Sequence, residues 1–422
     1  MKNLLKKFNV YLMTILLSTE MIACASLSTA SVSQASAGNT KGYYVATDGN
    51  DNNPGTQEKP FASVAKAQEA ASTGDTVYIR GGTYKNFTIA DSDTNYNYVN
   101  EITKSGITYE AYSSKEVPVF DFANITTAKR VAAFYVKPDV KNVTFQSIKV
   151  TGVPVGNQKQ SECFRIEGNA IFNQVTCSDN QAIGFYFTGH STGSCIRCDS
   201  YNNIGVKGIS IGNIDGFGAH GDGVTFKECR SWNNSDDGYD CINSKGANTF
   251  DSCWAFNMNA GGDSNGFKIG GWGKKPIDFM PPVHTVKNCL SVNNGAHGFY
   301  ANHQPGQSAT WTNNTAYGNK KGNFTMLECA SISNPTDIPG TKEVLHYNLS
   351  YKGNSLDEAN LPAENNTNNS WNEADKSLSA NDFQSLDASQ LTIDRGPNGE
   401  LPDITFMKPT NSSIVKGLGC LN

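Results

Sequence analysis

Three short segments in the middle of the chain share a Gly-aromatic pair flanked by residues that could do chemistry. They read Asp-Gly-Phe-Gly, Asn-Ser-Asp-Asp-Gly-Tyr-Asp and Ser-Asn-Gly-Phe-Lys, and they span residues 215–218, 234–240 and 264–268. A fourth pair follows at Gly298-Phe299. If each segment forms one coil of a stacked structure, equivalent residues lie about 4.8 Å apart on neighbouring strands. The polar residues of all segments then fall on one patch.

That patch would hold four carboxylates and one ammonium group. They belong to Asp215, Asp236, Asp237, Asp240 and Lys268. Such a cluster of carboxylates repels itself unless a cation lies within it. Calcium takes about six to eight oxygen ligands, mostly carboxylates and carbonyls, so we interpret the four aspartates as a calcium site. A lone Asp-Asp-Gly is more often only a turn, but two coils in register with Lys268 on the next coil favour a metal.

Lys268 is the residue that could give the patch a reaction. Side chains alternate along a strand, so an inward Phe267 leaves Lys268 pointing outward, as an inward Tyr239 does for Asp240. Lys268 could be only a salt-bridge partner of the aspartates. Alternatively, a bound cation lowers the pKa of Lys268, and a neutral fraction abstracts a proton α to a carboxylate. In a uronic acid polymer that proton is on C5, and its loss releases the C4 glycosidic oxygen without water.

A recurring phrase, Cys-x-(Ser/Ala)-x-Asn, indicates the architecture that would position this patch. It begins at Cys198, Cys229, Cys253 and Cys289, and Asn replaces Cys at 314 and 348. Repeats at spacings of about 20–50 residues are the signature of a solenoid, and the short strands between them carry no helical pattern. We therefore predict an all-β, single-domain parallel β-helix of roughly ten coils. The cysteines are interpreted as a buried column rather than as disulfides, the repeated Asn as a ladder, and Phe217, Tyr239, Phe267 and Phe299 as an inward stack.

The two ends of the chain differ from this repeat. Residues 1–37 combine a basic start, an apolar run at 10–17 and a small-residue site, which predicts a signal peptide cleaved near Ala37 and a secreted protein. Residues 61–71 have helical spacing and predict a short helix that caps the first coil. Residues 355–422 lose the repeat, and we expect an irregular tail packed on the β-helix, so that 38–422 is one domain.

The composition limits the partners. The formal net charge is −5, and no basic cluster interrupts the chain, which argues against nucleic acid or an anionic membrane as a partner. Beyond the N-terminal segment no apolar run is long enough to cross a bilayer. An anionic polysaccharide held through a bound cation remains compatible, and we expect a monomer.

The three segments, and the chain from Tyr43 to the tail, resemble the pectate lyases of polysaccharide lyase family nine. The resemblance implies a right-handed parallel β-helix, a secreted calcium-dependent enzyme and β-elimination of polygalacturonate, a plant cell-wall polysaccharide, to 4,5-unsaturated oligogalacturonides. It implies that Lys268 is the Brønsted base. It also implies calcium ligands at Asp215, Asp236, Asp237 and Asp240. The chain has His220 where the family often carries Lys, so the resemblance leaves the subsite preference open if that Lys contacts substrate carboxylates. Rhamnogalacturonan is an alternative substrate that the sequence does not separate from polygalacturonate.

Two other classes of function compete with elimination. A polygalacturonase-type hydrolase shares motifs like Asn213-Ile-Asp215-Gly and Ala296-His297-Gly298, but here Phe-Lys-Ile at 267–269 precedes the histidine and has no Arg. This order argues against hydrolysis. A non-catalytic β-helical adhesin fits the repeats and export but not the acidic cluster with its lysine. Further candidates for binding uronate carboxylates are Lys207, Lys245, Lys274 and Lys275.

Overall fold

The structure is a computed structural model, and it describes residues 40–271, 281–303, 305–331, 333–334, 336–372 and 377–421. The chain divides into two compact units, Met1–Asn39 and Thr40–Asn422. The predicted signal peptide at 1–37, with its cleavage near Ala37, lies outside the described residues. The architecture below is that of Thr40–Asn422 alone. Within its described part, no helix combines the length and hydropathy that crossing a membrane requires.

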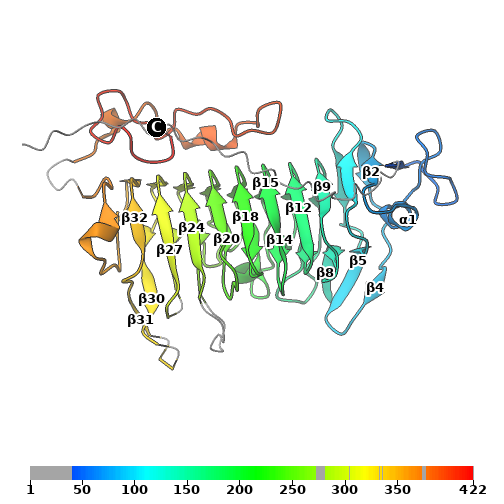
Figure 1. The fold of residues 1–422 in the computed structure, drawn as a ribbon, viewed down its shortest axis with the longest axis horizontal. Helices are drawn as coiled ribbons and strands as arrows, with labels where there is room; N and C mark the ends of the chain where they lie inside the picture. Colours follow the sequence, from blue (N-terminus) through cyan, green and yellow to red (C-terminus); the bar gives the residue numbers. More distant parts are fainter. Residues whose placement is uncertain are drawn as a thin grey trace, which may run out of the picture. The chain divides into compact units, whose positions relative to one another are not determined.

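Thr40–Asn422 is a parallel β-helix, and successive coils add one short strand to each of three sheets (Figure 1). Sheet A contains β1 Gly42–Val45, β2 Thr76–Ile79, β6 Thr108–Ala111, β9 Val143–Gln146, β12 Asn169–Asn173, β15 Thr192–Ile196, β18 Val224–Lys227, β21 Thr249–Asp251, β24 Val283–Lys287, β27 Ser308–Thr312, β32 Val344–His346 and β34 Asn366–Thr367. Sheet B contains β3 Gly82–Tyr84, β7 Pro118–Asp121, β10 Lys149–Thr151, β13 Thr176–Ser178, β16 Asp199–Tyr201, β19 Arg230–Trp232, β22 Trp254–Phe256, β25 Leu290–Val292, β28 Thr315–Tyr317 and β33 Leu349–Tyr351.

Sheet C completes each coil and carries the predicted patch. It contains β4 Asp91–Ser92, β5 Tyr96–Ile102, β8 Arg130–Val136, β11 Glu162–Ile166, β14 Ile183–Phe187, β17 Phe217–Ala219, β20 Tyr239–Asp240, β23 Phe267–Lys268, β26 His297–Tyr300 and β29 Gly322–Thr325. Only its first pair, β4 with β5, is antiparallel. A separate antiparallel pair is formed by β30 Leu327–Cys329 and β31 Asp337–Pro339. The sequence prediction of an all-β parallel β-helix is confirmed.

One α-helix, α1 Val64–Ala70, lies at the N-terminal end of the described coils. Ser63 caps it, since the hydroxyl of Ser63 accepts a hydrogen bond from the backbone N–H of Lys66 at 3.1 Å. Val64 and Ala67 are buried against the first strands. The predicted short N-terminal helix is confirmed. It covers apolar surface that would otherwise be open at the first coil.

The interior is built from columns of like residues, as the register predicted. Phe217, Tyr239, Phe267 and Phe299 are fully buried and stack with ring centroids 4.9, 4.7 and 5.0 Å apart. Cys198, Cys229, Cys253 and Cys289 form a second buried column of free thiols, because the residues that follow them pair in register. Stacked side chains of one type interdigitate without voids, and this fixes the register of the outward residues as well.

The bend from sheet A into sheet B explains the recurring phrase. A residue with left-handed backbone precedes each member of the cysteine column and its continuation, with φ between 53° and 59° at Arg197, Glu228, Ser252, Asn288, Asn313 and Tyr347. The Asn that ends the phrase is left-handed too, as at Asn202 and Asn233, a conformation that Asn tolerates better than most residues. The predicted buried ladder is formed one residue later, where Asn203 donates to Asn234 at 2.9 Å.

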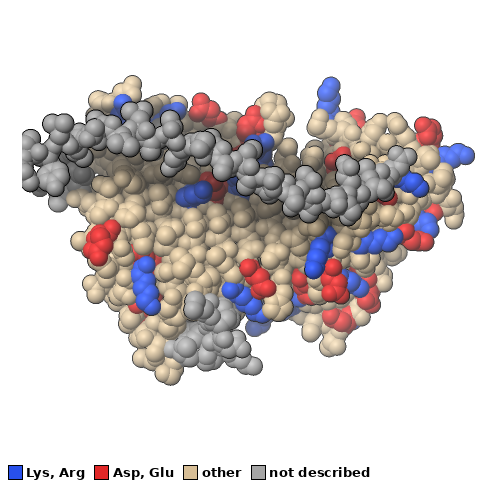
Figure 2. All heavy atoms as spheres, in the orientation of Figure 1, with Lys and Arg blue, Asp and Glu red and all other residues tan. Residues whose placement is uncertain are grey.

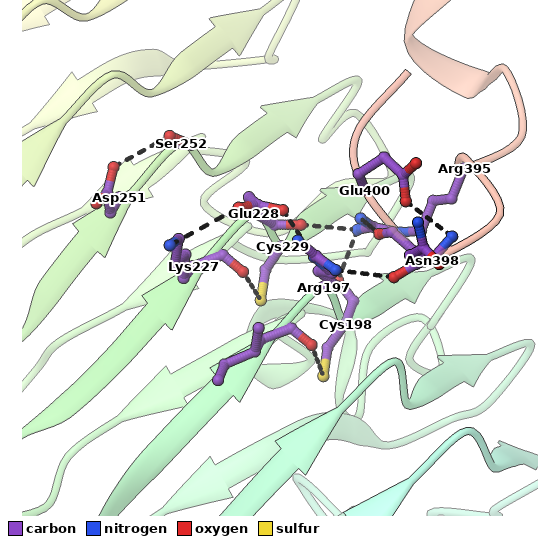
Figure 3. A network of polar contacts seen from close by, with 12 residues as sticks. Arg197, Cys198, Lys227, Glu228, Cys229, Asp251, Ser252, Arg395, Asn398 and Glu400 are labelled. Carbon is purple, nitrogen blue, oxygen red and sulfur yellow. Dashed lines mark hydrogen bonds and ion pairs between the residues drawn. The ribbon is translucent and has the colours of Figure 1, made fainter. Parts of the chain in front are cut away.

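Residues after 355 pack along sheet B. Apolar side chains on the outer face of this sheet, such as Phe256 and Leu290, are buried against tail residues such as Phe406 and Met407. Polar contacts add to this packing (Figure 3): Arg197 donates to the carbonyl of Asn398 at 2.8 Å. The tail contains short 3-10 helices at Ala363–Asn365, Ala380–Asp382 and Ala388–Thr392, besides Ile211–Asn213 earlier in the chain. Within the segment predicted to be irregular, β34 pairs with β32 and extends sheet A.

The tail also contacts sheet B through a buried ion cluster. Asp199 of β16 accepts two hydrogen bonds from Arg230, at 3.1 and 2.8 Å, and three from Arg395 of the tail, at 3.1, 3.2 and 2.6 Å. Burial would raise the pKa of Asp199, but the hydrogen bonds and charges of the two guanidinium groups outweigh it and hold the pKa below its usual range.

Figure 2 shows that Lys and Arg lie mixed with Asp and Glu on the face in view, without a continuous patch of either sign.

Candidate active site

The outer face of sheet C carries two parallel rows of side chains. The Lys268 row, which follows the strand register, consists of Arg165, Tyr186, Gly218, Asp240, Lys268, Tyr300 and Thr325. The Asp237 row lies three residues earlier on each coil and consists of Glu162, Ile183, Asp215, Asp237, Asn265, His297 and Gly322. The Gly-aromatic pairs at 216–217, 238–239, 266–267 and 298–299 lie between the rows. The predicted alignment on these pairs is therefore the observed register.

Backbone N–H groups hold all four predicted aspartates in place. Each carboxylate accepts one such bond: Asp215 from Asp237 at 3.1 Å, Asp236 from Asp263 at 2.5 Å, Asp237 from Asn265 at 2.8 Å and Asp240 from Ile242 at 2.7 Å. Three of these donors belong to the next coil or to the loop that leads into it. One oxygen of each carboxylate is thus fixed by the fold, and the second oxygen of Asp237 and of Asp240 faces Lys268.

The aspartates form two overlapping groups. Ligand oxygens of Asp215, Asp237 and Asp240 lie within 4.8 Å of one another, as do those of Asp236, Asp237 and Asp263. Asp237 is common to both groups. The structure thus brings three of the four predicted residues together, and it places Asp236 beside Asp263, a residue that the sequence analysis did not name.

Lys268 lies between the two groups. The Nζ atom of Lys268 is 3.2 Å from Asp237, 3.4 Å from Asp240 and 3.0 Å from Asp263. Its side chain is only 11% exposed, although it points away from the core as predicted. The lysine is therefore an ion-pair partner of these aspartates.

The charges of the cluster do not balance. Burial and repulsion by Asp236, Asp240 and Asp237 raise the pKa of Asp215 well above its usual value. Burial and Asp237 raise the pKa of Asp236 to about 8. Burial also raises the pKa of Asp237 to about 6, against the opposing charge of Lys268. One ammonium group is too little to neutralise these carboxylates.

Lys268 responds in the opposite direction. Burial by itself would lower the pKa of Lys268, but the carboxylates of Asp240, Asp237 and Asp263 outweigh burial and raise the pKa far above its ordinary value. A lysine in this state keeps its proton at any working pH. A cation that neutralised the carboxylates would remove the cause of this shift.

The donor set fits a hard divalent cation. Every ligand atom is a carboxylate oxygen, which suits calcium. The Oδ2 atom of Asp237 is completely buried and has no hydrogen-bond partner within the described structure, and its one cationic neighbour among the described ion pairs is Lys268 at 3.2 Å. A buried carboxylate oxygen without a hydrogen bond is costly unless it binds a cation.

Other candidates from the sequence are less central. Lys207 and Lys245 are exposed and belong to loops on either side of sheet C, and Lys274 and Lys275 lie outside the described residues. His220 follows β17 and packs against Tyr186, with ring centroids 5.1 Å apart. Burial lowers the pKa of His220, so this side chain is neutral where the family often has a lysine.

Sequence reasoning missed two residues that complete the site. Asp263 is 64% exposed on the loop before β23 and contacts Lys268; an acidic residue two positions before Asn265 was the available signal. Asn265 donates its side-chain amide to Asp237 at 2.9 Å. In the alignment of the Gly-aromatic segments, Asn265 stands in the Asp237 row, where the two preceding coils carry Asp.

Comparison with known proteins places this geometry in a family. The family model described as Pel9A-like, right handed beta helix region matches residues 43–348. The chain belongs to this family. This Pel9A-like chain is 30% identical to pectate lyase L of Dickeya chrysanthemi over 392 residues, which cover 88% of the chain and 85% of that relative. It is also 26% identical to a pectate lyase of Emericella nidulans over 415 residues, with 88% and 93% covered.

Two solved structures resemble the Pel9A-like chain closely. A rhamnogalacturonan lyase structure is 34% identical, has a TM-score of 0.82, and is matched over 90% of this chain and 100% of that chain. The crystal structure of pectate lyase Pel9A is 26% identical, has a TM-score of 0.66, and is matched over 89% and 90%. These similarities confirm the resemblance to the family nine pectate lyases and the right-handed parallel β-helix.

Proposed function

We propose that this protein is a secreted, calcium-dependent lyase that cleaves polygalacturonate by β-elimination, with Lys268 as the Brønsted base. The observation that supports this best is the position of Lys268, within 3.4 Å of carboxylates on two coils and on the outward face of sheet C. The pectate lyases among its relatives support the reaction class.

Asp215, Asp237 and Asp240 would hold the calcium ion, with Asp236 as the fourth carboxylate of the set. Calcium bound there would neutralise the carboxylate of a galacturonate unit and make its α-proton more acidic. Asn265 contributes indirectly, since its two hydrogen bonds to Oδ1 of Asp237 leave Oδ2 of that carboxylate available.

Lys268 would take the C5 proton of the bound galacturonate onto Nζ. The electrons of the broken C–H bond form the C4–C5 double bond, and the C4–O bond to the next sugar breaks. The departing oxygen receives a proton from solvent, and the new non-reducing end is a 4,5-unsaturated uronide. Lys268 can act only when neutral, so neutralisation of Asp237, Asp240 and Asp263 is a condition of the reaction.

Rhamnogalacturonan is the second candidate substrate. The rhamnogalacturonan lyase structure is matched at 34% identity over 90% of this chain, against 26% for pectate lyase Pel9A. The neutral His220 at a position where the family often has Lys also favours a substrate with fewer carboxylates.

Digestion of both polymers in parallel tests the proposal. Purified protein with calcium should produce ultraviolet-absorbing unsaturated products, and a chelator should stop their formation. New reducing ends without that absorbance would mean a hydrolase. Binding without any loss of viscosity would mean an adhesin.

Export and assembly are proposals as well. We expect the protein in the culture medium of an expressing cell, with a new N-terminus near Ala37, and as a monomer without affinity for nucleic acid or membranes. N-terminal sequencing and light scattering of the exported protein check these points, and an intact N-terminus on a cell-bound form would contradict them.

A further inference from the structure

The clustered aspartates and Lys268 lie at the centre of the outer face of sheet C. In the Lys268 row and the Asp237 row, the calcium and lysine groups lie on the three neighbouring coils of β17, β20 and β23. The next strand on one side, β26, presents His297 and Tyr300. The next strand on the other side, β14, presents Ile183 and Tyr186. Neighbouring strands lie about 4.8 Å apart, a spacing close to the length of one sugar unit in a polysaccharide.

His297 and Tyr300 form a stacked aromatic pair directly beside Lys268. Their ring centroids are 4.5 Å apart, with an angle of 21° between the planes. Two hydrogen bonds fix the rings: Nδ1 of His297 lies 2.8 Å from the hydroxyl of Thr325, and the hydroxyl of Tyr300 donates to Asn302 at 3.2 Å. Both side chains are half-buried, so part of the pair faces solvent.

The pair is uncharged near neutral pH. Burial, with the charge of Lys321, lowers the pKa of His297 to about 4, and burial raises the pKa of Tyr300 to about 12. An uncharged aromatic surface packs against the C–H face of a sugar ring. It offers no counter-charge for a second carboxylate, whose desolvation would be unfavourable there.

Strand β14, on the other side of the aspartate cluster, also presents an uncharged aromatic side chain, that of Tyr186. Gly218 allows Tyr186 and His220 to approach, since a Cβ at Gly218 would lie 2.9 Å from the ring of Tyr186 and 3.1 Å from Nε2 of His220. One strand further, Arg165 is already paired, with Glu167 at 2.5 Å. Within the described strands β14 and β11, on this side of the central site, no uncompensated cation therefore lies on the sheet surface.

We propose that the Tyr300–His297 pair is the floor of a subsite that receives an uncharged sugar next to the galacturonate held at Lys268. The inference rests on the proposed function and favours its second candidate substrate over polygalacturonate: a polymer in which uronate units alternate with neutral sugars. Lys321, which is exposed and precedes β29, is the nearby cation that could instead bind a carboxylate.

Kinetics of single variants with calcium test this subsite. The probes are a rhamnogalacturonan oligosaccharide and an oligogalacturonate of equal length. Tyr300→Ala should raise KM for the alternating oligosaccharide about three- to tenfold with little change in kcat, the range expected for losing one aromatic contact. Tyr300→Phe keeps the ring and should retain wild-type KM. Tyr112→Ala, which removes a 44% exposed tyrosine remote from sheet C, should change neither.

A variant that reverses the substrate preference makes the test sharper. Tyr300→Arg adds a guanidinium group beside Lys268 and should shift kcat/KM in favour of oligogalacturonate. Lys321→Ala should leave the alternating oligosaccharide unaffected. If Lys321→Ala weakens oligogalacturonate selectively and Tyr300→Ala weakens neither substrate, the subsite holds a uronate and the proposal is wrong.

Calorimetric titration separates this inference from the proposed function. Calcium-loaded Lys268→Ala protein, with and without Tyr300→Ala, is titrated with both oligosaccharides. Weaker binding of the alternating one alone in the double variant supports the subsite even if the wild-type protein cleaves nothing, a result that would overturn only the lyase proposal. Equal affinities of both proteins for it would overturn the subsite, whatever the wild-type activity.

Discussion

Two buried carboxylates on opposite sides of the β-helix show how differently this fold uses the same group. Asp199 on sheet B is bound by two arginines, one of them from the tail, and burial is outweighed so that the pKa of Asp199 is lowered. Asp237, which lies just before strand β20 of sheet C, is completely buried among other carboxylates, and burial raises its pKa to about 6. Both carboxylates are buried, so the opposite directions of their pKa shifts come from the charged groups beside them.

The contrast distinguishes a structural ion cluster from a functional one. At Asp199 every charge has a protein partner, so the cluster stabilises the fold but has no capacity left for a ligand. At Asp237 one carboxylate oxygen has no hydrogen bond and the negative charges exceed the positive ones. Such an imbalance is unfavourable by itself, and it would favour the binding of a cation.

Removing the base should have the largest effect. Lys268→Ala should lower the initial rate of elimination by about 10²–10⁴-fold, the usual contribution of general-base catalysis. Lys268→Arg should be almost as inactive, because a guanidinium group keeps its proton. Circular dichroism should show an unchanged fold. An Ala variant that retains more than about a hundredth of the rate would show that Lys268 is not the base.

Breaking the satisfied cluster should affect stability instead of activity. Asp199→Ala leaves two buried guanidinium groups without their carboxylate, and should lower the free energy of unfolding by about 3–5 kcal/mol. The control is Asp403→Ala, whose side chain is 97% exposed and should change stability by less than about 0.5 kcal/mol. Denaturant titration measures both. A stable Asp199 variant, or a folded one without lyase activity, would contradict this division of roles.

Removing an aspartate from the unsatisfied cluster should weaken the metal site. Asp237→Ala should reduce activity at limiting calcium by about 10–100-fold, the range seen when a metal site is disturbed, and excess calcium should restore part of it. Full activity of this variant in the presence of a chelator would mean that the aspartates are only turn residues.

The smallest effect concerns pH in chelator-treated protein. Burial raises the pKa of Asp236 in the folded state to about 8, above its ordinary value of 3.8, so between these values the folded state holds a proton that the unfolded state has released. Stability should therefore fall as pH rises from about 4 to about 8. The charged groups of Asp237, Asp263 and Lys268 face the carboxyl group of Asp236. Added calcium should reverse the fall of stability with rising pH. Asp236→Asn should reduce the change in Tm between about pH 4 and about pH 8 by a few degrees. A steeper dependence of Tm on pH in this variant would contradict the prediction.

Much of the fold and the centre of the site could be predicted because each coil reuses the same positions. The Gly-aromatic pairs fix the register, and strand alternation then places Asp240 and Lys268 outward. The ring stack and the cysteine column follow from the same rule. A repeated pattern makes long-range neighbours readable, since a contact between coils becomes a match between equivalent positions.

What lies outside the repeat could not be predicted in the same way. Asp263 belongs to an inserted loop with no counterpart on the neighbouring coils, so nothing in the alignment placed it at Lys268. The stacking of Tyr300 on His297 depends on side-chain rotamers, which the register leaves open. Arg395 carries no local mark of its partner Asp199, which is 196 residues away.

This last contact affects how the chain folds. Coils of a solenoid touch only their neighbours, so such a stack can form from one end and fray from the other. Arg395 closes a loop of 196 residues onto a middle coil, and closing a loop of this size is slow and entropically unfavourable. The middle coils therefore reach their full stability only after the last part of the chain has docked. Once docked, the tail makes unfolding cooperative across the coils that it joins.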